Sequence, residues 1–475
     1  MRVASAGSGW AVPVCAGILV FLLGAHPEDD RVPRLMVQAQ SAARHGLHGE
    51  SLEDLEAMLA FDPALAALHL PAAELALRAG QPERALTHLD AADHLLPADD
   101  LRSCKRMEAM LQAGDWTSAE TLWSTSQGVC QGDAALIHHW VEDLWDRNAY
   151  LEASGFLDAL QASTASTDVT SLDLRRAALA DVVFRPERAA SSLRRALAAL
   201  SGPDPLLAAL AELDQPSQGT TMAPYYASVG GALANAEEWG LAREALQRAL
   251  AEEPNLAVAR AYLGMAIQRM GEPGWGQILA ALLTDPSSSA VWTIVGDYRL
   301  ERGDATESLH AYQQAARLDS NNAAAAAGMG AALATMGRID EAIEAYTHAT
   351  ELAPSDPRFW MLLSRLSLRL DFDVHSVGLP AARNAVAQEP ENPSAWAALG
   401  YAHVLAGEPR LGLRLILTSI DIGASDPETY YHLGLAYLAL GDHPGAEAAL
   451  EAAVELDPQG PIGEIARRTL EALRP

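Results

Sequence analysis

The chain has 475 residues, of which 49% are hydrophobic but only 6% aromatic, because Ala and Leu make up most of its apolar side chains. That composition is typical of closely packed helices and argues against a β-rich fold. Asp and Glu outnumber Lys and Arg by 62 to 33, which gives a formal net charge of −29. A chain this acidic repels phosphate groups, so nucleic-acid binding is excluded as its main function.

Residues 1–31 are predicted to form a signal anchor or a signal peptide. Residues 3–25 carry no charge, and residues 10–23 are almost wholly apolar. This uncharged run is long enough to span a bilayer, although its short dense core is also typical of a cleaved signal peptide. Cleavage after Ala25 would place the bulky Leu23 where a small residue is preferred, so we favour the uncleaved anchor. Arg2 before the apolar run and acidic residues after it indicate that the rest of the chain lies outside the cytoplasm.

A period of about 34 residues runs through the remainder of the chain. It is visible in residues that favour the left-handed conformation at which helices end, namely Gly46, Gly80, Gly114, Asn148, Gly271, Gly303, Gly337, Asp371, Gly407 and Gly441. Gly and Asn are the usual residues at such helix ends. Each of these positions is therefore predicted to be the turn of a helix pair.

The clearest copy of the repeat lies at residues 430–458. Its aromatic, small and large apolar positions and its closing proline are Tyr430, Leu433, Gly434, Tyr437, Ala446, Leu450, Ala453 and Pro458. This pattern resembles the tetratricopeptide repeat, or TPR. The resemblance implies an all-α fold, an α-solenoid in which helix-turn-helix units stack on one another.

The domain organisation follows from where the repeats keep their register. We predict a degenerate block of about five TPR-like repeats at residues 32–200 and a clearer block of about seven at residues 223–460, about 12 in all. Residues 201–222 are rich in Pro, Gly and Ser, which predicts a hinge or an insertion. Residues 461–475 are predicted to form a C-terminal capping helix.

Sequence motifs of catalysis are missing. The chain has no Walker-type loop, no Gly-x-Ser-x-Gly elbow and no Cys-x-x-Cys pair. The nearest approach to a metal site is the group His138, His139, Glu142 and Asp143, which we interpret as a solvated helix surface because two ligands on one face do not make a site. We therefore predict a protein that is not an enzyme and that uses no cofactor or metal.

Cys104 and Cys130 fall within one repeat, residues 100–133. In an antiparallel helix pair the start of the first helix lies beside the end of the second, so a disulfide between them is feasible. Export would place both in an oxidising compartment. The alternative is two independent buried thiols.

The TPR resemblance implies a concave groove lined by the first helix of each repeat. At its C-terminal end the places that face a ligand include apolar and aromatic side chains beside a basic cluster: Arg358, Met361, Arg365, Arg369, Tyr401, Val404, Leu405, Tyr431 and Leu435. The Lys and Asn residues with which chaperone-binding members clamp a carboxylate are absent from the fifth and ninth places. The groove therefore suits an amphipathic helix or a peptide with an acidic flank. The alternative is that these side chains pack against neighbouring repeats.

These observations predict a protein-interaction scaffold or assembly factor without catalysis of its own. Its partner is expected to be a protein or peptide, in particular another envelope or membrane protein. The repeats are expected to be anchored to the membrane by the N-terminal segment, or secreted after cleavage near Ala25. The alternative function is an accessory or carrier subunit that presents a glycan, a peptide or a cofactor to a membrane enzyme.

Overall fold

The computed structural model describes residues 31–63, 65–96, 100–130, 134–162, 171–200, 202, 204–213 and 221–473. Within those ranges the regular elements are all helices, so the expected all-α repeat architecture is confirmed there. The anchor or signal peptide predicted at residues 1–31 lies outside them except for its last residue. Among the helices of the described ranges, none has both the length and the apolar character needed to cross a membrane.

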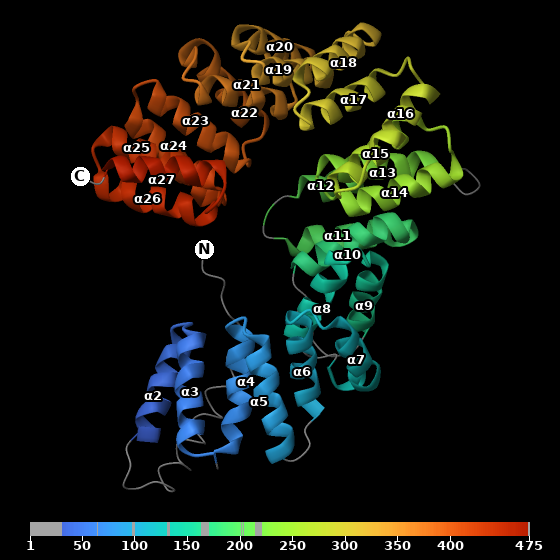
Figure 1. Cartoon of the computed structure of the whole chain (residues 1–475). Coiled ribbons are helices and arrows are strands. Elements are labelled where there is room, and N and C mark those ends of the chain that lie inside the picture. Colours follow the sequence, from blue (N-terminus) through green and yellow to red (C-terminus); the bar gives the residue numbers. More distant parts are fainter. Residues whose placement is uncertain are drawn as a thin grey trace. The chain divides into compact units, whose positions relative to one another are not determined.

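The chain divides into two compact units. Their helices are labelled in Figure 1. The first comprises residues up to 220 together with residues 235–245, and the second comprises residues 221–234 and 246–475. Helices α13 (Ala223–Asn235) and α14 (Trp239–Glu252) are therefore each shared between the units. The two units are described separately below.

The first unit contains five helix pairs in sequence order. They are α2 (Arg31–Arg44) with α3 (His48–Phe61), α4 (His69–Arg78) with α5 (Pro82–Leu95), α6 (Asp100–Gln112) with α7 (Trp116–Cys130), α8 (Ala134–Asp146) with α9 (Tyr150–Ala162), and α10 (Ser171–Phe184) with α11 (Pro186–Ala199). A single 3-10 turn, η1 (Ala66–Leu68), precedes α4. Part of the segment predicted as a hinge or insertion is helical: α12 (Pro205–Ala211) packs on α10 and α11.

The second unit continues with further pairs of the same kind. They are α15 (Ala257–Arg269) with α16 (Trp275–Thr284), α17 (Ser289–Glu301) with α18 (Ala305–Leu318), α19 (Ala323–Thr335) with α20 (Ile339–Leu352), α21 (Pro357–Arg369) with α22 (Leu379–Gln388), α23 (Pro393–Leu405) with α24 (Pro409–Ile422), and α25 (Pro427–Leu440) with α26 (His443–Leu456). A short π-helix, η2 (Val374–Gly378), leads into α22, and α27 (Pro461–Leu473) closes the array. Consecutive first helices from α15 to α25 contact one another, so they form one continuous layer.

The turn inside most pairs is made by a residue with positive φ, whereas Arg185 between α10 and α11 has φ −140°. At Gly407 (φ 83°) the chain leaves α23, and the amide of Glu408 donates to the carbonyl of His403 at 2.8 Å. That is the usual way to satisfy the free carbonyls of a helix C-terminus. The ten positions singled out by the 34-residue period all have positive φ, including Asn148 (φ 60°) and Asp371 (φ 49°).

Two kinds of hydrogen bond recur at the start of first helices in the second unit. The N-cap side chains of five of them accept a hydrogen bond from a backbone amide of the first turn: Ser288, Asn322, Asp356, Asn392 and Asp426. In three of these helices a tryptophan indole also donates to the carbonyl of the proline six residues earlier, at 2.7 to 2.9 Å. These tryptophans are Trp292, Trp360 and Trp396. The repeated sequence thus fixes where these five first helices start.

Within a pair, a glycine of the first helix receives a large side chain of the second. A Cβ at Gly400 would lie 2.6 Å from Cγ1 of Ile416, and one at Gly434 would lie 2.7 Å from Cγ of Leu450. The absence of a side chain at these glycines lets the helices approach closely. Leu450 also packs with Ala466 and Leu470 of α27, so the last helix covers the apolar face that the final pair would otherwise expose.

Candidate functional site

The side chains predicted to line the groove come from three first helices of the second unit. Helix α21 carries Arg358, Met361, Arg365 and Arg369; α23 carries Tyr401, Val404 and Leu405; and α25 carries Tyr431 and Leu435. Since α23 contacts both α21 and α25, the three helices lie side by side in that order. The three arginines are exposed, and the six apolar or aromatic side chains are half-buried.

The half-buried side chains are largely used in packing between repeats. Met361, Tyr401 and Leu405 pack against a buried cluster that includes Leu368 and Ala402. Val404 and Tyr431 pack against two further clusters nearer the C-terminus. These contacts agree with the alternative in which these side chains pack against neighbouring repeats.

Tyr401 is also covered by a ring from the next repeat. The imidazole of His432 stacks on it with 4.0 Å between ring centroids and 10° between the planes. Burial raises the pKa of Tyr401 to about 12 and lowers the pKa of His432 to about 4, so both rings are neutral at pH 7. This stack joins α23 to α25 and leaves less aromatic surface for a partner than the sequence suggested.

The three arginines differ in how they are engaged. Arg358, 71% exposed, forms an ion pair with Asp356, the N-cap of its own helix, at 2.6 Å. Arg365 reaches from α21 to Glu428 on α25, with 3.2 Å between Nη2 and Oε2. Arg369 lies one turn after Arg365, at the last position of α21.

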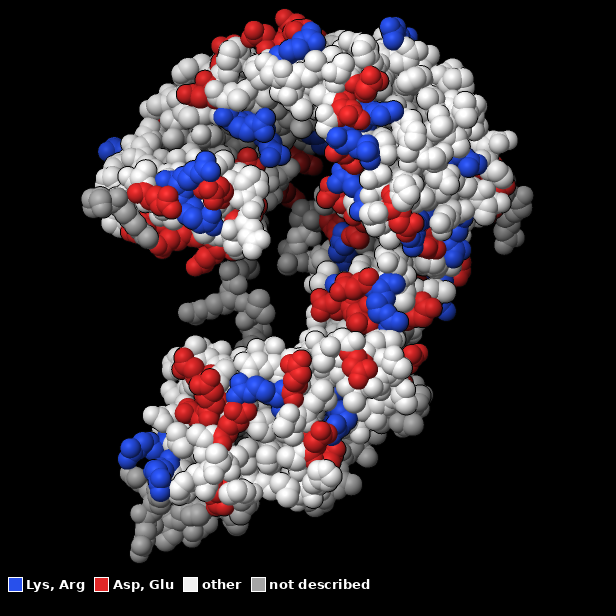
Figure 2. Space-filling model, in the orientation of Figure 1, with Lys and Arg blue, Asp and Glu red and all other residues white. Residues whose placement is uncertain are grey.

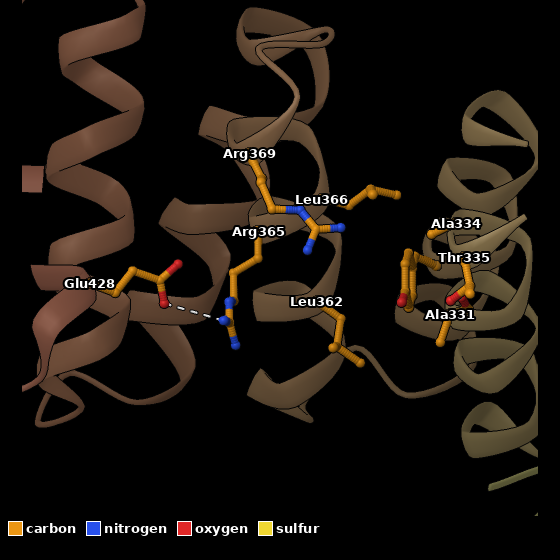
Figure 3. A pocket seen from close by; sticks show the side chains of 9 residues that line it. Ala331, Ala334, Thr335, Leu362, Arg365, Leu366, Arg369 and Glu428 are labelled. Carbon is orange, nitrogen blue, oxygen red and sulfur yellow. Dashed lines mark hydrogen bonds and ion pairs between the residues drawn. The ribbon is translucent and has the colours of Figure 1, made fainter. Parts of the chain in front are cut away.

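Arg365 and Arg369 line a pocket of about 280 Å³ (Figure 3). Its other lining residues come from α19, α20, α21 and α25: Ala331, Ala334, Thr335, Tyr346, Leu362, Leu366 and Glu428. Figure 3 shows Arg365 directed toward Glu428, whereas the guanidinium of Arg369 lies on the side of Ala334 and Thr335. The pocket thus combines two cations with an aliphatic wall.

The electrostatics of the pocket follow from these positions. Burial raises the pKa of the Tyr346 phenol, and the positive charges of Arg369 and Arg365 act in the opposite direction because a nearby cation stabilises the phenolate. On the face of the molecule in Figure 2, basic side chains form small groups among acidic ones. Against a net charge of −29, the neighbouring Arg365 and Arg369 place two positive charges at one point of the surface.

Two tetratricopeptide repeat family models match the chain, at residues 299–366 and 427–459. A curated relative, "Tetratricopeptide repeat protein 37" of Xenopus laevis, is 25% identical over 215 residues, which are 44% of this chain. The chain thus contains tetratricopeptide repeats at these two places. This TPR protein spans only 14% of the length of that relative.

Solved structures with the same kind of helical array have low similarity to this TPR protein. The Cut9–Hcn1 hetero-tetramer of the APC/C is 14% identical, with a TM-score of 0.45 and coverage of 98% of this chain and 99% of that one. Yeast Tom70 is 12% identical, with a TM-score of 0.41 and coverage of 94% and 96%. MamA of Desulfovibrio magneticus RS-1 is 22% identical, with a TM-score of 0.32 and coverage of 36% and 95%.

Sequence reasoning named two of the nine lining residues, Arg365 and Arg369, and missed the other seven, among them Tyr346, Leu362, Leu366 and Glu428. Glu428 stands at the second place of its repeat, one of the places that the TPR resemblance marks as facing a ligand. Glu428 could have been found from the sequence by including the second position of each repeat with the fifth and ninth positions. The two leucines lie one residue after Met361 and Arg365 and line the pocket together with residues of α19, α20 and α25.

His138 and His139 each pair with a buried carboxylate on a neighbouring first helix. His138 on α8 lies 3.2 Å from Asp173 on α10, and His139 lies 3.8 Å from Glu108 on α6. In the part of the chain that the structure covers, no group of three or more His, Cys, Asp or Glu side chains is arranged to hold a metal ion.

The two cysteines of the first unit are joined. Cys104 on α6 and Cys130 at the end of α7 form a disulfide, with 5.3 Å between their Cα atoms. Both are buried. The bond links the two helices of the third repeat.

Proposed function

We propose that this protein is a non-catalytic interaction scaffold or assembly factor that holds an acidic, partly aliphatic segment of a partner protein in the groove of its second unit. The observation that carries the proposal is the pocket in which Arg365 and Arg369 stand beside Leu362 and Leu366. A carboxylate accepts hydrogen bonds from a guanidinium, and an aliphatic side chain buries its surface against the leucines.

We further propose that the repeats lie outside the cytoplasm, with the N-terminal segment as a membrane anchor, and that the partner is an envelope or membrane protein. The uncharged residues 3–25 support this location, and so does a disulfide between Cys104 and Cys130, since such bonds persist in oxidising compartments. Fractionation of native cells with N-terminal sequencing tests it. A chain recovered from the cytoplasm with both thiols free would contradict it.

The binding proposal is tested with the full chain on an array of randomised short peptides, followed by anisotropy titrations of the selected sequences. We expect selection of Asp or Glu next to Leu, Ile or Met. The variant Arg369→Gln should lose about tenfold in affinity, as expected for one charge-assisted contact.

Arg338→Gln is the matched control. Arg338 is also an exposed arginine of the second unit, but it pairs with Glu341 at the start of α20 and does not line the pocket. If both variants lose affinity equally, binding reflects net charge and not the pocket. If the array shows no preference for acidic sequences, the proposed function is wrong.

A further inference from the structure

Glu428 forms an ion pair with Arg365, one of the two cations of the pocket. Its carboxylate reaches Arg365 across α23, which lies between the helices that carry the two residues. Other ion pairs of this unit are more local: Arg338 and Glu341 stand three residues apart on one helix, and Arg269 and Glu301 lie on adjacent first helices. The pair between Arg365 and Glu428 therefore crosses the surface that a partner would cover.

This ion pair is poorly suited to hold the array together. The side chain of Arg365 is 60% exposed and that of Glu428 is 40% exposed, and a single contact of 3.2 Å joins them. Exposed pairs of this kind contribute little to folding. The contacts between α23 and its neighbours, with the stack of Tyr401 on His432, already connect these repeats.

The two arginines are consequently not equivalent toward an anion. Arg369 has no acidic partner within the described pocket, whereas Arg365 has Glu428. A carboxylate that enters the pocket meets Arg369 first and is repelled by Glu428 as long as the latter holds Arg365. For both arginines to bind the incoming acid, Glu428 has to give up its partner.

We propose that Glu428 is a built-in competitor, which occupies Arg365 in the free protein and is displaced by an acidic side chain of the partner. This inference rests on the proposed function and specifies the regulation of the same pocket. The exchange replaces one guanidinium–carboxylate pair by another, so its free-energy cost is small. Partners with enough negative charge to pair with both arginines are therefore favoured. Neutral apolar segments, which cannot displace Glu428 from Arg365, are disfavoured.

The experiment measures binding of a short labelled peptide of alternating Leu and Glu to the full chain at low salt, with a Leu and Gln peptide as the neutral probe. Glu428→Gln should bind the acidic peptide about two- to fivefold more tightly than the wild type, which is the range that an exposed ion pair can supply. Affinity for the neutral peptide should not rise. Glu428→Asp keeps the charge but shortens the reach, and should fall between the two.

Glu341→Gln is the matched control, because it also removes one negative charge and breaks an exposed pair with an arginine, away from the pocket. It should leave peptide affinity unchanged. In an Arg365→Gln background, Glu428→Gln should gain much less than it does in the wild type, since its effect operates through Arg365. The melting temperature of Glu428→Gln should match that of the wild type.

Two results would overturn the inference, and only the second would also overturn the proposed function. If Glu428→Gln binds the acidic peptide no better than the wild type while Arg369→Gln still loses affinity, Glu428 is no competitor but the proposed function stands. If Glu428→Gln binds no acidic peptide even at low salt, both the competitor and the proposed acidic site are wrong.

Discussion

Tyr312 of α18 lies between two glycines, Gly296 of α17 and Gly328 of α19. The ring is almost fully buried, and its hydroxyl donates to Oδ1 of Asp297 at 2.6 Å. A Cβ at either glycine would collide with the ring. At the scale of single residues, the close helix contacts of this array therefore depend on pairing one large side chain with neighbours that have none.

The first prediction concerns Gly328. Gly328→Ala should lower the free energy of unfolding by roughly 1–3 kcal/mol, because a rigid buried ring cannot move out of the way of the added methyl group. Chemical denaturation measures this. The matched control is Gly276→Ala in α16, where a Cβ would meet nothing within 4 Å, so this variant should be neutral or slightly stabilising. Equal stability of the two variants would contradict the close contact.

The second prediction concerns pH. Burial raises the pKa of Asp297 from its ordinary 3.8 to about 6, although the hydrogen bond from Tyr312 acts in the opposite direction. The folded state therefore holds this proton more tightly than the unfolded state, and the contribution of Asp297 to stability falls as pH rises from about 4 to about 6.

Asp297→Asn cannot ionise and still offers an oxygen to Tyr312. It should be more stable than the wild type at pH 7.5, and this advantage should disappear toward pH 4. Denaturation curves across this range measure the difference. Asp421→Asn, which neutralises an exposed carboxylate of α24, provides the control for net charge. A constant difference between Asp297→Asn and the wild type at all pH values would refute the assignment.

At the scale of elements, five first helices of the second unit start at a capping side chain whose spacing follows the repeat. Asp426 shows this most fully: its Oδ1 accepts from the amide of Thr429 at 2.9 Å and its Oδ2 from the Thr429 hydroxyl at 2.7 Å. Thr429 is 1% exposed, so water cannot replace Asp426 as the acceptor for its hydroxyl. A cap of this kind orients α25 before its apolar face packs.

The third prediction follows from this cap. Asp426→Ala should lower the free energy of unfolding by about 1–2 kcal/mol, because it leaves a helix amide and a buried hydroxyl without their acceptor. Asp304→Ala is the comparison, since Asp304 holds the corresponding N-cap of α18 without a capping hydrogen bond from its side chain. It should change stability by less than about 0.5 kcal/mol. Thermal denaturation of both variants decides the point, and equal losses would count against the cap.

At the scale of the whole molecule, stability is expected to be local, because each repeat contacts mainly its neighbours. The first unit carries the disulfide between Cys104 and Cys130, which are 26 positions apart. A bond that closes a loop of this size restricts the unfolded chain. Its effect should therefore be confined to the repeats around α6 and α7.

The fourth prediction is that reduction, or the double variant Cys104→Ala with Cys130→Ala, lowers the stability of the first unit by roughly 3 kcal/mol. Hydrogen exchange followed by mass spectrometry should show faster exchange in helices α6 and α7 and unchanged exchange in α17 to α26. Uniform acceleration along the chain would show that the array unfolds as one body.

The turns within the repeats could be predicted from the sequence because they depend on local chemistry. A left-handed turn favours Gly, Asn or Asp, so it leaves a mark at a fixed interval along the chain. Gly407, Asp371 and Asn148 were recognised in this way, and all have positive φ.

Which side chains of the groove are free to meet a partner was decided by the tertiary structure. Tyr401 belongs to the places that face a ligand, yet His432 of the next repeat stacks on it. Arg365 and Glu428, 63 positions apart, meet only because successive repeats bring α21 and α25 to the same surface. Spacing within one repeat determines which side of a helix faces inward, whereas the contacts of that side depend on the angle between repeats, which no single repeat encodes.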